Sequence, residues 1–150
     1  MSCNTDPCKD VVCGDEGTCV DGTCDCNFGY EKDADNLCNT PWAMKFVGSN
    51  LSATDSCYGG SQNVGVYVYA TNITMTDATT LSSTNLFGYG SSNVINVDVT
   101  SSDEVSINYT DVAGRIFSGS GMKSGNTLTM DVVVQFPGGG ADTCKTMVNY

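Results

Sequence analysis

The chain has 150 residues, a formal net charge of -11, nine cysteines and no histidine. Such an acidic chain repels phosphate backbones, so we expect no nucleic-acid partner. Histidine is the most frequent general base and a common zinc ligand, and any catalytic set here would consist of carboxylates and tyrosines alone. We therefore expect a protein that is not an enzyme and that holds no cofactor and no metal.

The first forty residues are rich in cysteine. Between Cys8 and Cys38 the spacing is C-x4-C-x5-C-x4-C-x-C-x11-C. Zinc modules usually show paired C-x2-C knuckles, often with a histidine, and neither feature is present. The pattern favours disulfides and an oxidising compartment, although six cysteines allow 15 pairings from sequence alone.

This spacing, with "CNFGY" at residues 26–30, resembles an EGF-like domain. The resemblance implies a module over residues 8–38 with the pairs Cys8–Cys19, Cys13–Cys24 and Cys26–Cys38. About 31 residues bury too little surface to fold unaided, so the bridges would take the place of a core. Some EGF-like domains bind calcium through residues just before the first cysteine, where Asn4 and Asp6 stand in this chain. Pro7 and the short "CVDGTC" depart from that pattern and favour an acidic, solvated face.

Residues 1–7 are predicted to form an N-terminal tether. The segment "MSCN" resembles the end of a bacterial lipobox, with Ser2 as the small residue before the modified cysteine. This resemblance implies that Cys3 carries a lipid anchor, which would be the protein's only attachment to a membrane. An odd cysteine that is free, or that pairs between two molecules, is the alternative.

Residues 39–42, "NTPW", are predicted to be a linker, and residues 43–150 an all-β domain. Apolar and polar residues alternate over residues 64–70, 94–100, 104–110 and 128–134, which is typical of half-buried strands. The glycine-rich segments 88–93 and 119–125 are interpreted as hairpin turns. We count about eight strands, in an antiparallel barrel or a two-sheet sandwich.

The predicted core of this domain draws on apolar residues spread along residues 44–134. Cys57 and Cys144 bracket nearly all of the region, and a bridge between them would close a loop of 88 residues (57 through 144), worth roughly 4 to 5 kcal/mol in the chain-entropy model. The predicted core residues are Met44, Phe46, Val66, Val68, Ile73, Met75, Leu86, Phe87, Ile95, Val97, Ile107, Ile116, Leu128, Met130, Val132 and Val134.

Four segments make a closer resemblance: "KFVGSNLSATDSC", "LSSTNLFG", "FSGSGMKSGNTLTMDVVVQF" and "DTCKTMVNY". With the preceding module, they resemble surface lipoproteins of the Bacteroidota that carry an EGF-like module and a lipocalin-like β domain. The resemblance implies an address on the extracellular face of the outer membrane, or secretion. It implies an architecture more directly than an activity.

Three functions follow as hypotheses. The first is a non-enzymatic recognition or adhesion module for a cell-surface or extracellular ligand, either a glycan or a protein. The second is a lipocalin-like binder of a small apolar molecule or glycan, and the third is a subunit that self-associates into a surface fibre. Tyr67 and Tyr69 are the candidate ligand-binding residues, on the premise that Val66 and Val68 face the core and the tyrosines face outward. Loops 85–92 and 137–142 are the alternative binding region.

Overall fold

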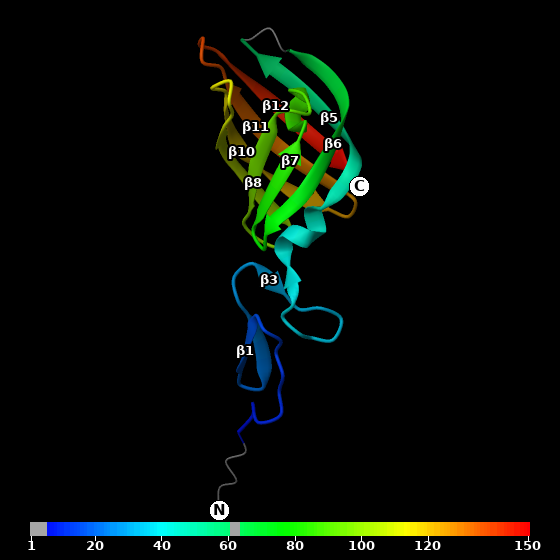
Figure 1. The fold of residues 1–150 in the computed structure, drawn as a ribbon, viewed down its shortest axis with the longest axis vertical. Helices are drawn as coiled ribbons and strands as arrows, with labels where there is room; N and C mark the ends of the chain where they lie inside the picture. The colour runs from blue at the N-terminus through cyan, green and yellow to red at the C-terminus, as the bar shows by residue number, and fades with distance from the viewer. Residues whose placement is uncertain (1–5, 61–63) are drawn as a thin grey trace, which may run out of the picture.

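The computed structural model describes residues 6–60 and 64–150 and shows an elongated, all-β molecule. A small cysteine-rich segment (residues 8–38) leads into a larger barrel (Figure 1). In the cysteine-rich segment, β1 (Gly17–Val20) pairs with β2 (Thr23–Cys26) in a hairpin. Its two turn residues, Asp21 and Gly22, both have positive φ, which matches the right-handed twist of the flanking strands.

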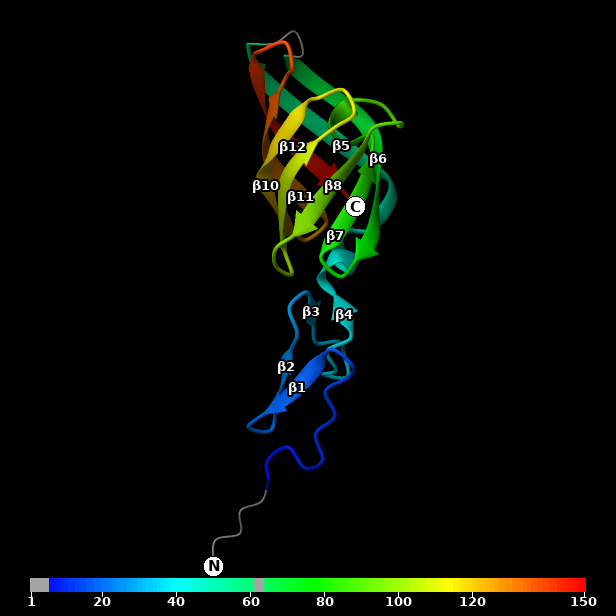
Figure 2. The same cartoon turned by 60° about the vertical axis from the view of Figure 1, so that its left-hand side comes forward.

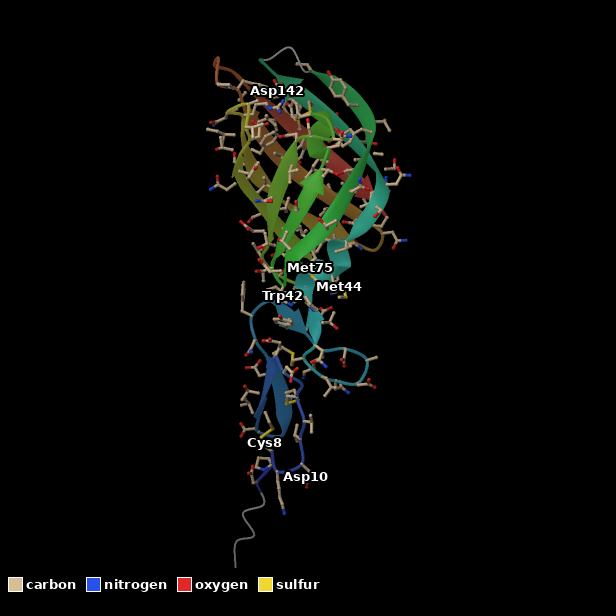
Figure 3. All side chains as sticks on the ribbon, viewed as in Figure 1. Cys8, Asp10, Trp42, Met44, Met75 and Asp142 are labelled. Carbon is tan, nitrogen blue, oxygen red and sulfur yellow. A yellow bond between two sulfur atoms is a disulfide. The ribbon has the colours of Figure 1, made fainter. Side chains whose placement is uncertain are left out.

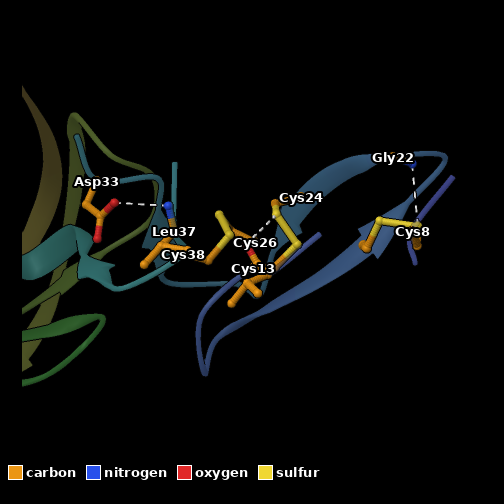
Figure 4. Close-up of a disulfide and its surroundings, with 10 residues drawn as sticks. Cys8, Cys13, Gly22, Cys24, Cys26, Asp33, Leu37 and Cys38 are labelled. Atoms are coloured by element: carbon orange, nitrogen blue, oxygen red, sulfur yellow. Dashed lines mark hydrogen bonds between the residues drawn. A yellow bond between two sulfur atoms is a disulfide. The ribbon is translucent and has the colours of Figure 1, made fainter. Parts of the chain in front are cut away.

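Three disulfides hold the cysteine-rich segment together (Figure 4). They join Cys8 to Cys19, Cys13 to Cys24 and Cys26 to Cys38, with Cα separations of 5.8, 5.3 and 5.2 Å. This is the pairing implied by the sequence resemblance. Only Cys13 and Cys38 among the apolar side chains of this segment are buried, so the bridges replace a hydrophobic core.

The joint between the cysteine-rich segment and the barrel has fixed contacts. β3 (Tyr30–Glu31) pairs with β4 (Thr40–Pro41), and a 3-10 helix, η1 (Trp42–Phe46), follows directly. The Trp42 backbone N–H donates to the Gly29 carbonyl at 2.8 Å, and the Trp42 ring meets the edge of Phe28 at 5.0 Å between centroids. The predicted linker 39–42 is therefore paired and packed.

Eight antiparallel strands form a closed barrel in which each strand follows its neighbour along the chain (Figures 1 and 2). The last strand pairs with the first, with Cys144 opposite Cys57, and this pairing closes the wall. The all-β fold class predicted from the sequence is confirmed. Of the two predicted architectures, an antiparallel barrel and a two-sheet sandwich, the structure is the barrel. The strands are β5 (Gly48–Gly59), β6 (Gly65–Asp77), β7 (Thr80–Thr84), β8 (Val94–Val99), β9 (Glu104–Thr110), β10 (Ile116–Ser124), β11 (Thr127–Gln135) and β12 (Ala141–Asn149).

Inward side chains fill the barrel, and η1 places Phe46 against its lower end. Eleven of the predicted core residues are buried: Phe46, Ile73, Leu86, Phe87, Ile95, Val97, Ile107, Leu128, Met130, Val132 and Val134. Five predicted core residues are wrong, because all are exposed: Met44, Val66, Val68, Met75 and Ile116. Met44 and Met75 lie near the joint, at the lower end of the barrel (Figure 3), and the valines face outward because of the parity of β6.

The predicted turn at 119–125 is also wrong over most of its length. Gly119 and Gly121 lie within β10, and the turn to β11 begins only after Ser124. A Cβ on Gly119 would stand 2.1 Å from the Asp131 carbonyl oxygen and 2.8 Å from the Val132 Cα. These glycines let neighbouring backbone approach closely, a role that glycine takes in strands as well as in turns.

Candidate ligand cavity at the mouth of the barrel

The end of the barrel farthest from the cysteine-rich segment contains a hollow that we call the mouth cavity. Asp142 marks this end in Figure 3, opposite Trp42 at the joint. The cavity has a volume of about 250 Å³. A second hollow, of about 430 Å³, lies between outward side chains of β9, β10 and β11 and is a groove in the outer wall. The mouth cavity is lined by Asp55, Cys57, Tyr67, Val68, Tyr69, Phe87, Gly88, Tyr89 and Cys144.

The mouth cavity forms where the wall is incomplete. β7 is short and pairs only with the Asn72–Asp77 part of β6, so the upper part of β6 has no β7 beside it. The connection from β7 to β8 folds over this gap and contains a short 3-10 helix, η2 (Leu86–Gly88). The Asn85 amide ties it to β6 by donating to the Ala70 carbonyl at 2.8 Å.

Phe87 is held in a strained conformation above the cavity. Its φ of 63° lies in the left-handed region, which is a genuine outlier for a bulky side chain. The ring stacks on Phe117 at 5.3 Å between centroids, and the side chain is 6% exposed. Burial of the ring in the core holds this backbone in place, and such strain is found most often at functional sites.

The premise that Tyr67 and Tyr69 face outward is wrong. In β6 the odd-numbered residues point into the barrel, as buried Thr71 and Ile73 show. Tyr69 packs against the core, while Tyr67 stands near the rim and is 44% exposed. Both tyrosines line the mouth cavity, so they remain candidate ligand residues from the inside of the barrel.

Tyr69 connects three parts of the cavity wall through its hydroxyl. The hydroxyl donates to Asp55 Oδ1 at 2.9 Å and accepts the Phe87 backbone N–H at 2.8 Å. Burial raises the pKa of Tyr69 well above its usual value, and the neighbouring charge of Asp55 raises it further. The phenol therefore keeps its proton and serves as a donor to the carboxylate.

Asp55 is a carboxylate inside the barrel and is 1% exposed. Among residues 6–60 and 64–150, no lysine or arginine forms an ion pair with it. Burial raises its pKa, and the hydroxyls of Thr146 and Tyr69 act in the opposite direction. Thr146 stands directly opposite Asp55 on β12. The cavity thus contains a buried acid whose neighbours are neutral.

Tyr89 forms another side of the cavity and already faces a cation. The Arg115 guanidinium lies 3.8 Å from the centre of its ring, and Arg115 Nε donates to Asp111 Oδ2 at 2.6 Å. Burial raises the pKa of Tyr89, the Arg115 charge opposes the rise, and the carboxylates of Asp142, Asp55 and Asp111 add to it. The charge of Arg115 is balanced by Asp111, which leaves Asp55 unbalanced.

The Cys57–Cys144 disulfide joins the first and last strands of the barrel and also contributes to the cavity wall. Its pairing is the one predicted from the sequence. Sequence reasoning did not identify Asp55 as a site residue. A signal was present, since Asp55 has the same parity as Leu51 and Ala53 in one strand, and an acid in an inward series is unusual.

The remaining predictions concern the lipid anchor and metal binding. Cys3 and Asn4 lie outside the described residues, so the structure does not bear on lipidation or on a calcium ligand there. Asp6 Oδ1 accepts the Cys8 backbone N–H at 2.9 Å. Within the described part of the chain, no group of three or more Cys, Asp or Glu side chains is placed to hold a metal ion. No helix among the described residues is long and apolar enough to cross a bilayer.

Comparison with known proteins supports the fold alone. No protein-family model and no curated protein sequence matches the chain. A redesigned β barrel matches 75% of this chain and 96% of its own length, with a TM-score of 0.52 and 9% sequence identity. A candidate outer membrane protein from Bacteroides fragilis NCTC 9343 matches 74% of this chain with a TM-score of 0.48 and 17% identity, and the match spans 53% of that protein.

Proposed function

We propose that the protein is a non-enzymatic recognition module displayed on the outer face of the cell, with the mouth of the barrel as its binding end. One observation carries the proposal: Cys8, which begins the cysteine-rich segment, and Asp142, which marks the mouth, lie at opposite ends of an elongated molecule (Figure 3). The cysteine-rich segment between them acts as a spacer. An anchor at the N-terminus would then leave the mouth cavity facing away from the membrane.

The joint supports a spacer that keeps its shape. Besides the Trp42 contacts, Lys45 Nζ pairs with the Glu31 carboxylate at 2.8 Å across the two parts, and the Ala43 N–H donates to the Ala78 carbonyl at 3.1 Å. These contacts tie the start of the barrel to β3 and to the β6–β7 turn. A fixed joint carries the mouth a constant distance from the anchor, which a flexible linker would not do.

Four disulfides support an extracellular address, because disulfides persist in oxidising compartments and are rare in the cytosol. The "MSCN" segment supports a lipid anchor at Cys3, and the resemblance to Bacteroidota lipoproteins supports the outer membrane as the site of attachment. On this proposal the spacer is an EGF-like module and the barrel is a lipocalin-like domain.

The proposal is tested by surface labelling of intact cells. The chain is produced behind a lipoprotein leader and treated with a membrane-impermeant amine reagent, which can reach exposed Lys32 and Lys145. We expect labelling of membrane-bound protein, and we expect Cys3→Ser to move the protein to the soluble fraction. Thr5→Ser in the same segment is the control. Protein that labels only after lysis would contradict surface display, and unchanged partitioning of Cys3→Ser would contradict the anchor.

A second candidate function, a carrier of a small molecule, is favoured by the mouth cavity itself. Its volume of about 250 Å³ is just below the range of roughly 300 to 1,000 Å³ found for drug-sized ligands. The rest of the barrel interior is filled, mostly with apolar side chains and with a few buried hydroxyls such as those of Thr71 and Ser83. A carrier of this kind would take a small compound at the mouth and has no room for a long lipid chain. Self-association through Cys3 stays a prediction, since that residue lies outside the described part.

A further inference from the structure

The mouth cavity combines aromatic rings with an uncompensated acid. Tyr67, Tyr69 and Tyr89 line it together with Asp55. Two buried aspartates of the barrel illustrate the difference in compensation: Asp111 has the Arg115 guanidinium, whereas in the described part of the chain Asp55 has the hydroxyls of Tyr69 and Thr146 beside it and no ion pair. A buried carboxylate is normally paired with a cation, and an unpaired one is costly to keep. The position is complementary to a positive charge brought by a ligand.

We propose that the mouth cavity binds a small organic cation, an amine or quaternary ammonium compound, with its positive group toward Asp55 and its alkyl groups against the tyrosine rings. Aromatic faces attract cations through their quadrupole, and recognition of ammonium groups by several rings is a recurring use of this effect. This inference deepens the proposed recognition function, because it assigns a ligand class to the mouth of the barrel.

The charges around the cavity select against other ligands. Arg115 is the largest charge acting on Tyr89, and the carboxylates of Asp142, Asp55 and Asp111 act against it, so three acids and one base surround this end of the barrel. The whole chain carries a net charge of -11, which raises the local concentration of cations and repels anions. A carboxylate or phosphate ligand would be repelled by Asp55, because that acid is buried and water does not screen its charge.

The size of the cavity limits the cation. A volume of about 250 Å³ corresponds to roughly eight molecules of liquid water at about 30 Å³ each. Compounds of the size of tetramethylammonium, choline or benzylamine fit this limit. Arg115 shows that a ring in this wall accepts a cation on its face, since its guanidinium lies 3.8 Å from the Tyr89 centroid. Asp111 holds that guanidinium, so it is not free to pair with Asp55.

The test uses the full chain with its disulfides intact and titration calorimetry. The probes are tetramethylammonium, choline, benzylamine and 3,3-dimethylbutanol, the neutral isostere of choline. We expect at least one of the cations to bind, and we expect the neutral isostere to bind at least about tenfold more weakly than choline if choline is the ligand. Equal binding of choline and its isostere, or no binding of any cation at millimolar concentration, would overturn the proposal.

Variants locate the site. Asp55→Asn removes the charge, keeps the shape and leaves an oxygen to accept from Tyr69, so it should weaken cation binding at least about tenfold at an unchanged fold. Asp98→Asn makes the same charge change on the outer wall of β8, where the side chain is exposed. Its affinity for the cation should stay within about twofold of the wild type. Equal losses in the two variants would place the effect in the overall charge and contradict the assignment.

Tyr67→Ala provides a second variant in case Asp55→Asn does not fold. Tyr67 is 44% exposed, and among the described residues its hydroxyl donates only to the Val64 carbonyl, at 3.3 Å, so we expect its removal to cost the fold little. Loss of the Tyr67 ring should lower the affinity for the cation several-fold, and an unchanged affinity would exclude Tyr67 from the site. None of these variants should alter surface labelling of intact cells. The labelling experiment therefore tests surface display, and the binding experiment tests the cation site, independently of each other.

Discussion

The two parts of the molecule are held together in different ways. The cysteine-rich segment has three disulfides and buries only Cys13 and Cys38 among its apolar residues. The barrel has one disulfide and a continuous core that includes Phe46, Phe117 and Met130. Short cross-linked loops stabilise by restricting the unfolded chain, whereas a core stabilises by burial. Reduction should therefore destabilise mainly the cysteine-rich segment, and packing defects should destabilise mainly the barrel.

Reduction gives the largest expected separation between the two parts. Each short bridge contributes about 3 kcal/mol in the chain-entropy model, so loss of all three should unfold the cysteine-rich segment. Trp42, the only tryptophan, lies at the joint against Phe28 and reports this event by its fluorescence. We expect its emission to change on reduction at temperatures where the β-sheet circular dichroism of the barrel persists.

The barrel bridge is separated from the others with the double variant Cys57→Ala/Cys144→Ala. In that variant, reduction acts on the cysteine-rich segment alone, while the barrel has already lost the roughly 4 to 5 kcal/mol that the model assigns to its long loop. A single transition followed equally by fluorescence and by circular dichroism, before and after reduction, would show that the two parts unfold as one unit.

A packing defect in β10 should affect the barrel and leave the cysteine-rich segment folded. Gly119→Ala places a methyl group against the backbone of Asp131 and Val132, which cannot move aside as a side chain can. We expect a loss of about 3 kcal/mol in the free energy of unfolding, the upper part of the usual cost of overpacking. Gly138→Ala, where a Cβ meets nothing within 4 Å, should change stability by less than about 0.5 kcal/mol in denaturant unfolding.

The inward and outward faces of β6 are distinguished by a smaller effect. Tyr69→Phe removes the hydroxyl that donates to Asp55 and accepts from the Phe87 N–H. We expect the free energy of unfolding to fall by about 2 kcal/mol. Val68→Ala on the same strand should lie within about 0.5 kcal/mol of the wild type, because Val68 is 73% exposed. Thermal unfolding of the two variants measures the difference. The opposite ranking would restore the sequence-based assignment of the faces.

The error over β6 shows what alternation can and cannot predict. In "VGVYVYA" both faces are apolar, so hydrophobicity does not distinguish Val66 and Val68 from Tyr67 and Tyr69. The parity of Ile73 in the same continuous strand does distinguish them, because the even-numbered valines and Ile73 cannot share a face without a bulge. Strands with one polar face, such as Leu128 to Val134 in β11, were predicted correctly because their two faces differ.

The eight strands and the antiparallel class were predictable from period two, while the mouth cavity was not. The cavity depends on the short length of β7, on the left-handed Phe87 and on the path of the connection that covers β6. These features arise from tertiary packing, since a bulky residue with positive φ has no local sequence signal. Loop 85–92, named from the sequence as an alternative binding region, does supply Phe87 and Tyr89 to the wall.

The smallest expected effect is a pH dependence that belongs to the barrel and differs in sign between two buried aspartates. Burial raises the pKa of Asp55 in the folded state above its usual 3.8, so the folded protein holds that proton more tightly than the unfolded chain does. Stability from this group is fully present below pH 3.8 and is lost as the pH rises through the folded pKa. Asp55→Asn cannot lose a proton, so its stability relative to the wild type should increase from acid toward neutral pH.

Asp111 should behave in the opposite way. Burial works to raise its pKa, but the hydrogen bonds and charge of Arg115 outweigh burial and hold that pKa below 3.8. Its stabilisation is present above pH 3.8 and is lost as the pH falls through the lower folded pKa. Asp111→Asn should therefore be less stable than the wild type at neutral pH and approach it in acid. Denaturant unfolding followed by circular dichroism between acid and neutral pH measures both variants, and pH profiles with the same sign would contradict the view that Asp111 is compensated by a cation and Asp55 is not.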